Sequence, residues 1–200
     1  STVYLIFICL ETKINLYGVH SIRRMSTIAT HDVLEVTPFL THSNLFDIIF
    51  RSPKDCEETA KRGEQMFDQF ECVEVELYDG IAYVRMNRPQ KRNAMNPQLH
   101  DEMEEALTDL EVHPDAKVIV ICGAGGNFSA GQDLKMFFRE NENNPLGRKK
   151  SQRAANRWRW ELLYNYDKPT IAMVEGYCVG GAFMQLLATD FAIAADDATF

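Results

Sequence analysis

Residues 117–134 read KVIVICGAGGNFSAGQDL, an apolar run that passes directly into a loop with four glycines. The apolar part, Lys117–Cys122, is rich in β-branched side chains and predicts a strand buried on both faces, as in a parallel sheet. The glycines that follow, from Gly123 to Gly131, allow positive φ and close approach of the backbone to a ligand. This stretch therefore predicts a buried strand that delivers a ligand-facing loop.

A second stretch has the same design. Thr170–Val174 predicts a strand, Gly176–Gly181 a glycine loop and Ala182–Ala188 an apolar helix. A helix amino terminus presents unpaired amide donors with a favourable dipole. Two such loops brought together would offer two amides to one developing oxyanion. The alternative is that the glycines only turn the chain. A dinucleotide site is disfavoured because Phe128 occupies its third small position.

The flanking segments predict the remaining strands and helices of an α/β fold. Val73–Leu77 alternates apolar and acidic residues, Asp79–Gly80 is a hairpin turn signal, and Ile81–Met86 is the returning strand. Helices are predicted from Asn96, as N-cap, to Pro114, and over residues 148–166; a last strand is predicted over residues 191–194. Four acidic residues of the first helix are expected to face solvent: Asp101, Glu102, Glu104 and Glu105.

Composition excludes several classes of protein. A chain of 200 residues with 46% apolar residues supports one globular core, and the net charge of −8 offers no general attraction for nucleic acid. Its five cysteines form no Cys-x-x-Cys pair, which argues against a disulfide scaffold or zinc site. The five histidines show no ligand spacing and are read as surface or loop residues. The apolar run Val3–Leu10 is too short to span a membrane, and we expect a cytoplasmic protein.

The first third of the chain differs from the rest. Residues 1–65 show no sustained helical or strand period and are interpreted as a leader of uncertain structure, appended or partly disordered. Residues 66–200 carry the strand and helix patterns described above and are interpreted as belonging to one domain.

Five motifs in a fixed order carry a resemblance to a known family. They are Asn87-Arg-Pro89, KRNAM at residues 91–95, FSAGQDL at 128–134, KPTIA at 168–172 and GYCVGG at 176–181. In this order they resemble the crotonase (enoyl-CoA hydratase/isomerase) superfamily, over residues 70–200. The resemblance implies an α/β fold of the crotonase type, a spiral of ββα units that is incomplete at the carboxy terminus. It also implies homotrimers, or dimers of trimers, for the full-length protein.

Within that superfamily, the segments at residues 158–163, 166–174 and 188–200 resemble the hydroxycinnamoyl-CoA (feruloyl-CoA) hydratase/lyases. This resemblance places the backbone amides of Gln132 and Gly181 in the oxyanion hole, as the catalytic groups. Five further residues would bind the CoA thioester: Lys91 and Arg92 at its phosphates, Ala130 and Leu134 along its path, and Phe137 beside the acyl group. Phe137 stands where this group usually has a tyrosine, which leaves the preferred ring substitution open.

The same resemblance implies the chemistry. Met184 occupies the position of the first catalytic glutamate of fatty-acid hydratases, and methionine cannot transfer protons. The hydratase/lyases use another glutamate, whose matching position falls beyond Phe200. The implied reaction is hydration and retro-aldol cleavage of 4-hydroxycinnamoyl-CoA to an aromatic aldehyde, such as vanillin, and acetyl-CoA. Neither a metal nor a cofactor is expected besides the coenzyme A of the substrate. The alternatives are a general enoyl-CoA hydratase/isomerase and a catalytically silent CoA-binding homologue.

Overall fold

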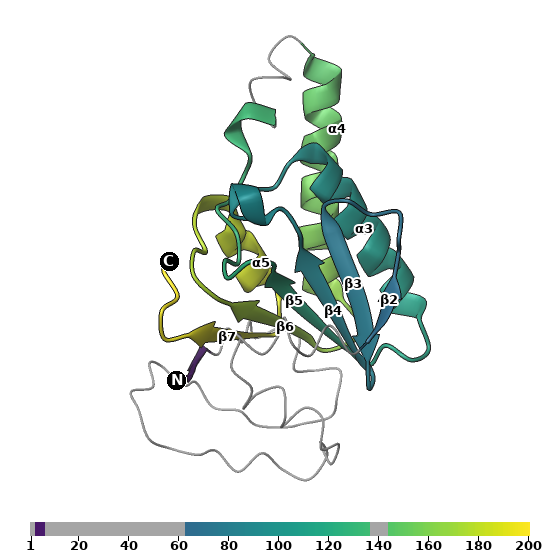
Figure 1. The fold of residues 1–200 in the computed structure, drawn as a ribbon. Coiled ribbons are helices and arrows are strands. Elements are labelled where there is room, and N and C mark those ends of the chain that lie inside the picture. Colours follow the sequence, from purple (N-terminus) through teal and green to yellow (C-terminus); the bar gives the residue numbers. More distant parts are fainter. Residues whose placement is uncertain (1–2, 7–62, 137–143) are drawn as a thin grey trace.

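The computed structural model describes residues 3–6, 63–136 and 144–200, which form a seven-stranded mixed sheet flanked by helices (Figure 1). The strand order is β1-β7-β6-β5-β4-β3-β2. Strands β4 to β7 are mutually parallel, whereas β2, β3 and β1 pair antiparallel with their neighbours. The strands are β1 (Val3–Ile6), β2 (Glu64–Met66), β3 (Val73–Tyr78), β4 (Ile81–Met86), β5 (Val118–Gly123), β6 (Thr170–Val174) and β7 (Phe191–Ala195).

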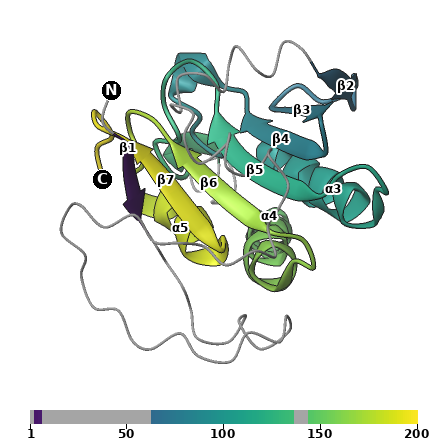
Figure 2. The same cartoon turned by 90° about the horizontal axis from the view of Figure 1, so that it is seen from below.

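Three α-helices lie along one face of the sheet (Figure 2). They are α3 (Pro97–Val112), α4 (Pro145–Asn156) and α5 (Phe183–Ala188). The helix predicted over residues 148–166 begins earlier than expected, because Asn144 caps it and Pro145 opens it. It also changes form, to the π-helix η5 (Arg157–Leu162) and the 3₁₀ turn η6 (Leu163–Asn165). Two further 3₁₀ turns, η3 (Pro89–Lys91) and η7 (Gly180–Ala182), border the candidate site described below.

Side chains of the central strands alternate between two buried layers, as predicted for a sheet covered on both faces. In β5, Ile119 and Ile121 join the main core under the helices, while Val120 and Cys122 join a second cluster with Ile171 of β6. Register therefore fixes which residues face the helices, and the loop after each strand starts from the same edge of the sheet.

A second, shorter layer of extended segments follows the strands. Isolated parallel bridges join Met95 to Gln132, Ser129 to Cys178, and Tyr177 to Thr199. Thus β4, β5 and β6 are each followed by a short bridged segment and then by a helix. This repeated order of strand, bridged segment and helix confirms the predicted spiral of ββα units.

Helix α3 begins and ends close to the predicted residues, but one of the four acidic side chains expected to face solvent is buried rather than exposed. The side chain of Asn96 accepts from the Leu99 amide, as an N-cap does, and Pro97 opens the helix. Glu102, however, does not face solvent. It is buried, and its carboxylate accepts from the backbone amides of Glu71, Cys72 and Val73 at 3.2, 2.8 and 2.9 Å. Glu102 of α3 therefore anchors the segment that enters β3.

Two strands of the sheet lie before or across the boundary predicted at residue 65 between the leader and the following domain. Strand β1, within the predicted leader, pairs antiparallel with β7 at one end of the sheet, and β2 spans the boundary itself. Most of the predicted leader lies outside the described residues.

Candidate active site

The loop after β5 is held in place by the turn formed by the KRNAM motif. Arg92 and Asn93 both have positive φ, at 48° and 54°. The Asn93 side chain accepts from the Arg88 amide and donates to the carbonyls of Ala124 and Asn127. The Ser129 hydroxyl donates to the Asn93 carbonyl at 2.7 Å and accepts from the Gly131 amide. The motif residues therefore shape the loop by hydrogen bonds rather than by forming a surface of their own.

Backbone bonds on both sides of Gln132 fix its amide. Ala130 N donates to the Arg92 carbonyl, and Asp133 N donates to the Met95 carbonyl. In an extended segment, successive amides point to opposite sides. The Gln132 amide therefore points away from Met95, and no hydrogen bond occupies it among the residues that the structure describes.

The loop after β6 brings a second unpaired amide to the same place. Ser129 N donates to the Tyr177 carbonyl, and Val179 N donates to the Ser129 carbonyl, so the two glycine loops run side by side. A Cβ built on Gly181 would lie 3.7 Å from the nitrogen of Gln132. The amide of Gly181 likewise donates to no group in the described part of the chain. Two amides without a hydrogen-bond partner among the described residues therefore lie close together at the point where the two glycine loops run side by side.

Glycine is required at the point where the loops meet. Gly131 has φ of +86°, and a Cβ there would lie 2.8 Å from the Val179 carbonyl oxygen and 3.1 Å from the nitrogen of Gly181. Real Cβ atoms do not approach a backbone oxygen so closely, so a side chain at this position would push the loops apart.

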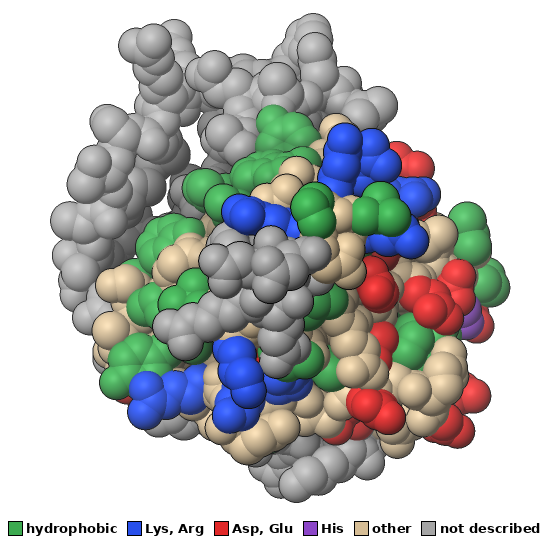
Figure 3. Space-filling view, turned by 90° about the horizontal axis from the view of Figure 1, so that it is seen from above, with side chains coloured by type: hydrophobic (Ala, Val, Ile, Leu, Met, Phe, Trp, Pro, Cys, Tyr) green, Lys and Arg blue, Asp and Glu red, His purple; other side chains and the backbone are tan. Residues whose placement is uncertain are grey.

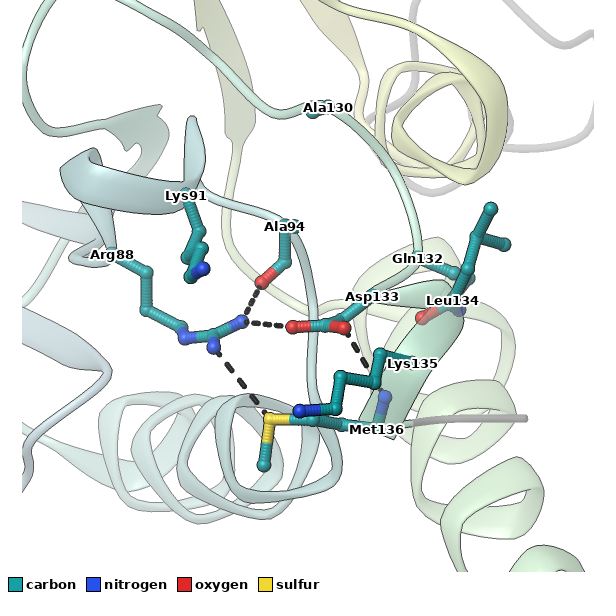
Figure 4. A pocket seen from close by; sticks show the side chains of 9 residues that line it. All are labelled: Arg88, Lys91, Ala94, Ala130, Gln132, Asp133, Leu134, Lys135 and Met136. Carbon is teal, nitrogen blue, oxygen red and sulfur yellow. Dashed lines mark hydrogen bonds and ion pairs between the residues drawn. The ribbon is translucent and has the colours of Figure 1, made fainter. Parts of the chain in front are cut away.

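A pocket of about 460 Å³ opens beside Gln132. Figure 4 shows Arg88 reaching toward Asp133 and the Ala94 carbonyl, with the Lys91 side chain beside Arg88. The lining residues are Arg88, Lys91, Ala94, Ala130, Gln132, Asp133, Leu134, Lys135 and Met136. On the surface seen in Figure 3, Lys and Arg side chains gather in clusters, with acidic side chains to one side. A pocket with three basic side chains suits an anionic ligand such as a phosphate.

Asp133 organises this pocket rather than facing it as a free acid. Its carboxylate pairs with the Arg88 guanidinium at 3.1 Å and accepts from the Met136 amide at 3.2 Å. Burial favours the protonated acid, but these hydrogen bonds and the charge of Arg88 outweigh it and lower the pKa of Asp133 below its ordinary value. Asp133 therefore caps the turn that follows it and also pairs with Arg88.

The opposite side of Gln132 faces the protein interior. Its side-chain amide lies 2.9 Å from His100 Nε2, and the indole nitrogen of Trp158 lies 3.0 Å from His100 Nδ1. His100 is fully buried, which corrects the reading of every histidine as a surface or loop residue. Burial, with the nearby charge of Arg159, lowers the pKa of His100 to about 3. The imidazole is therefore neutral and positions Gln132 from behind.

The predicted site residues fall into three groups. Lys91, Ala130, Gln132 and Leu134 line the pocket, and Gly181 lies beside Gln132. Arg92 instead places its guanidinium 5.0 Å from the centre of the Tyr177 ring and does not line the pocket. Phe137 lies outside the described residues.

Sequence reasoning missed Arg88 and Arg159. Arg88 belongs to the Asn87-Arg-Pro89 motif, which could have identified it. No sequence pattern around Arg159 in η5 predicts its burial, because only tertiary packing buries it.

Two further observations concern the surroundings of the amides. Met184 of α5 is 40% exposed, so an open thioether stands where fatty-acid hydratases are expected to carry a glutamate. Within the described ranges, His, Cys, Asp and Glu side chains form no group of three suited to a metal ion. Among the same residues, every helix is too short or too polar to cross a membrane.

Comparisons with known proteins agree with this geometry. Residues 76–200 match the family described as enoyl-CoA hydratase/isomerase. A hydroxycinnamoyl-CoA hydratase-lyase of Pseudomonas fluorescens is 52% identical over 133 residues, which cover 66% of this chain and 48% of that protein. A 4-chlorobenzoyl coenzyme A dehalogenase of Arthrobacter is 37% identical, over 64% of this chain and 46% of its own.

Solved structures give the same picture. The crystal structure of an enoyl-CoA hydratase from Shewanella pealeana superposes with a TM-score of 0.60 and 25% identity, over 72% of this chain and 51% of that chain. The chain spans about half the length of the curated relatives it matches.

Proposed function

Because the chain belongs to the enoyl-CoA hydratase/isomerase family, we propose that its protein hydrates and cleaves 4-hydroxycinnamoyl-CoA thioesters. Feruloyl-CoA would give vanillin and acetyl-CoA, and p-coumaroyl-CoA would give 4-hydroxybenzaldehyde and acetyl-CoA. Support for an aromatic acyl group comes from the names of two relatives, a hydroxycinnamoyl-CoA hydratase-lyase and a 4-chlorobenzoyl-CoA dehalogenase.

The observation that carries the proposal is the meeting of two unpaired amides, those of Gln132 and Gly181. When water adds at Cβ of an enoyl thioester, negative charge develops on the thioester oxygen. Preorganised amides stabilise this enolate, and losing one such donor typically costs on the order of 3–4 kcal/mol of barrier.

The reaction balances in two steps. Hydration places a hydroxyl on Cβ and a proton on Cα. Retro-aldol cleavage then removes the proton of the β-hydroxyl and breaks the Cα–Cβ bond. This releases the aldehyde and the enolate of acetyl-CoA, which takes up a proton at Cα. The same two amides serve both enolates, so one oxyanion hole supports the whole sequence.

Proton transfer requires a group other than the side chains nearest the amides. Met184 has no exchangeable proton, the neutral His100 is buried, and Asp133 is held in its ion pair with Arg88. We therefore assign the role of general base to the glutamate that the family resemblance places beyond Phe200.

The basic pocket is assigned to the coenzyme A moiety. Lys91 and Lys135 line it together with Arg88, and their charges suit phosphate groups. Ala130 and Leu134 line the same pocket as Gln132, which fits their proposed place along the pantetheine arm of coenzyme A.

The test uses protein expressed from the complete natural reading frame. Feruloyl-CoA is added, and aldehyde and acetyl-CoA are measured separately; the proposal expects both at equal rates. Crotonyl-CoA, which lacks the aromatic ring, is the matched control substrate. Turnover of crotonyl-CoA without aldehyde from feruloyl-CoA would make the protein a general hydratase. Binding of both thioesters without turnover would make it a silent homologue.

A further inference from the structure

The π-helix η5 turns two successive side chains into the interior. Trp158 is 0% exposed and Arg159 only 2% exposed, whereas the Arg157 side chain is 58% exposed and pairs with Glu104 at the surface. π-Helical turns are rare and occur frequently at functional sites. Here the turn buries an arginine, a residue that is seldom fully buried without a partner.

The guanidinium of Arg159 is surrounded by neutral groups. Nη2 lies 3.3 Å from the sulfur of Met95, and Nη1 lies 3.9 Å from the sulfur of Met184. Nη2 also lies 3.0 Å from the nearer terminal atom of the Gln132 side-chain amide. With its amide oxygen turned toward the guanidinium, Gln185 accepts from Nε at 3.3 Å and donates to the Gly181 carbonyl at 2.8 Å. The guanidinium also lies 5.1 Å from the centre of the Trp158 ring.

This buried cation forms no ion pair with any residue in the described ranges. Burial lowers the pKa of Arg159 to about 10, which leaves the side chain charged at neutral pH. A buried charge without a counterion costs stability, because the hydrogen bonds around it only partly replace its hydration. Such a cost calls for a compensating role.

The neighbours of Arg159 are the groups that form the oxyanion hole. The backbone of Gln132 supplies one of the two amides. The Met95 methyl carbon would lie 3.6 Å from a Cβ built on Gly181, which supplies the other. Met184 stands one turn further along. The guanidinium thus lies one side-chain layer behind both donors, inside a low-dielectric region.

We propose that Arg159 is a positioning residue of the oxyanion hole. Its guanidinium lies against the Gln132 side chain, donates a hydrogen bond to Gln185 beside Gly181, and adds a positive potential where the thioester oxygen becomes an enolate. The inference rests on the proposed oxyanion hole, but it does not depend on the identity of the acyl group. Any thioester whose reaction passes through an enolate would benefit.

Coulomb's law indicates the size of the effect. A unit charge roughly 8–10 Å away, at an effective dielectric constant of about 20, changes a rate on the order of ten- to thirtyfold. The Arg159→Gln variant removes the charge and keeps a hydrogen-bonding group, and Arg159→Lys keeps the charge. Arg157→Gln is the matched control, because it removes a surface arginine from the same helix.

A chromophoric thioester that cannot be hydrated reports the effect directly. The probe is 4-hydroxybenzoyl-CoA, whose Cα and Cβ belong to the aromatic ring and do not add water, bound to the full-length protein. Polarisation of its carbonyl in the oxyanion hole shifts its absorbance to longer wavelength. We expect Arg159→Gln to lose at least half of this shift with Kd changed less than threefold, while Arg159→Lys and Arg157→Gln keep most of it. In turnover, kcat should fall ten- to thirtyfold in Arg159→Gln with KM nearly unchanged.

Three results would overturn the inference, and they are distinguishable. A full absorbance shift and full kcat in Arg159→Gln would make Arg159 a packing residue only. If Arg159→Gln does not fold, a folded Arg159→Lys that has lost the shift would show that charge alone is not the cause. Bound probe without any shift in the unmodified protein would remove the oxyanion hole itself, and with it the proposed function.

Discussion

The charged side chains on the two sides of Gln132 lie in opposite environments, one open to solvent and the other buried. On the open side, Arg88 pairs with Asp133, and Lys91 and Lys135 line a pocket of about 460 Å³. On the inner side, the guanidinium of Arg159 is buried among sulfurs, amides and an indole ring, and no carboxylate pairs with it in the part of the chain that the structure describes. Charges at the open side are suited to binding a polyanionic ligand. A charge in the interior acts over distance, because the surrounding medium screens it weakly.

The largest expected effect comes from a substitution at the point where the two glycine loops meet, because it disturbs both sides of Gln132. Gly131→Ala should lower kcat by 10²- to 10³-fold, because the added methyl would lie 2.8 Å from the Val179 carbonyl and separate the two amides. Gly126→Ala is the matched control. Gly126 also has positive φ, at +70°, but nothing lies within 4 Å of a Cβ built on it. Steady-state kinetics of the two variants measures the difference. Equal losses would mean that backbone strain, and not the approach of the loops, limits activity.

The inner side should show a pH dependence of stability due to His100. Its pKa is lowered to about 3 in the folded protein, against an ordinary value of about 6.5 in the unfolded chain. Between these values the unfolded chain binds one more proton, so stability is fully present above the ordinary pKa and falls as the pH drops. The slope from this group should be on the order of 1 kcal/mol per pH unit between pH 6 and 4.

Urea unfolding at pH 7, 6 and 5 measures this slope. A His100→Phe variant should lose it, whereas His113→Phe, at the end of α3, should keep it. An unchanged slope in His100→Phe would show that His100 is protonated in the folded protein.

The smallest effect distinguishes two adjacent basic residues on the open side. Lys91→Gln should raise KM for the acyl-CoA substrate about fivefold, an effect that weakens as salt is added. Arg92→Gln should change KM less than twofold and cost about 0.5–1 kcal/mol of stability, because Arg92 lies over the Tyr177 ring. A larger KM effect from Arg92→Gln would return it to the phosphate-binding role that sequence analysis predicted.

Much of the fold was predictable because local signals agreed with one another. The strand at β5, the N-cap at Asn96 and the hairpin turn at Asp79–Gly80 all occur where sequence patterns place them. The two glycine loops were also predictable, since glycine at Gly131 is a local requirement of the backbone. Errors occurred where a polar side chain finds a distant partner. Glu102 was expected in solvent, yet it binds three amides some 30 residues away.

The sequence by itself determined strands β3 to β7, the Asn96 cap and the two glycine loops, because periodicity, capping and positive φ act over a few residues. Tertiary structure alone decided the environment of each charge. Arg88 and Arg159 have the same side chain. One gains Asp133, which is 45 residues away, and the other loses solvent to a π-helical turn. Desolvation and Coulomb energies depend on which distant groups come together, and only the folded chain sets those distances.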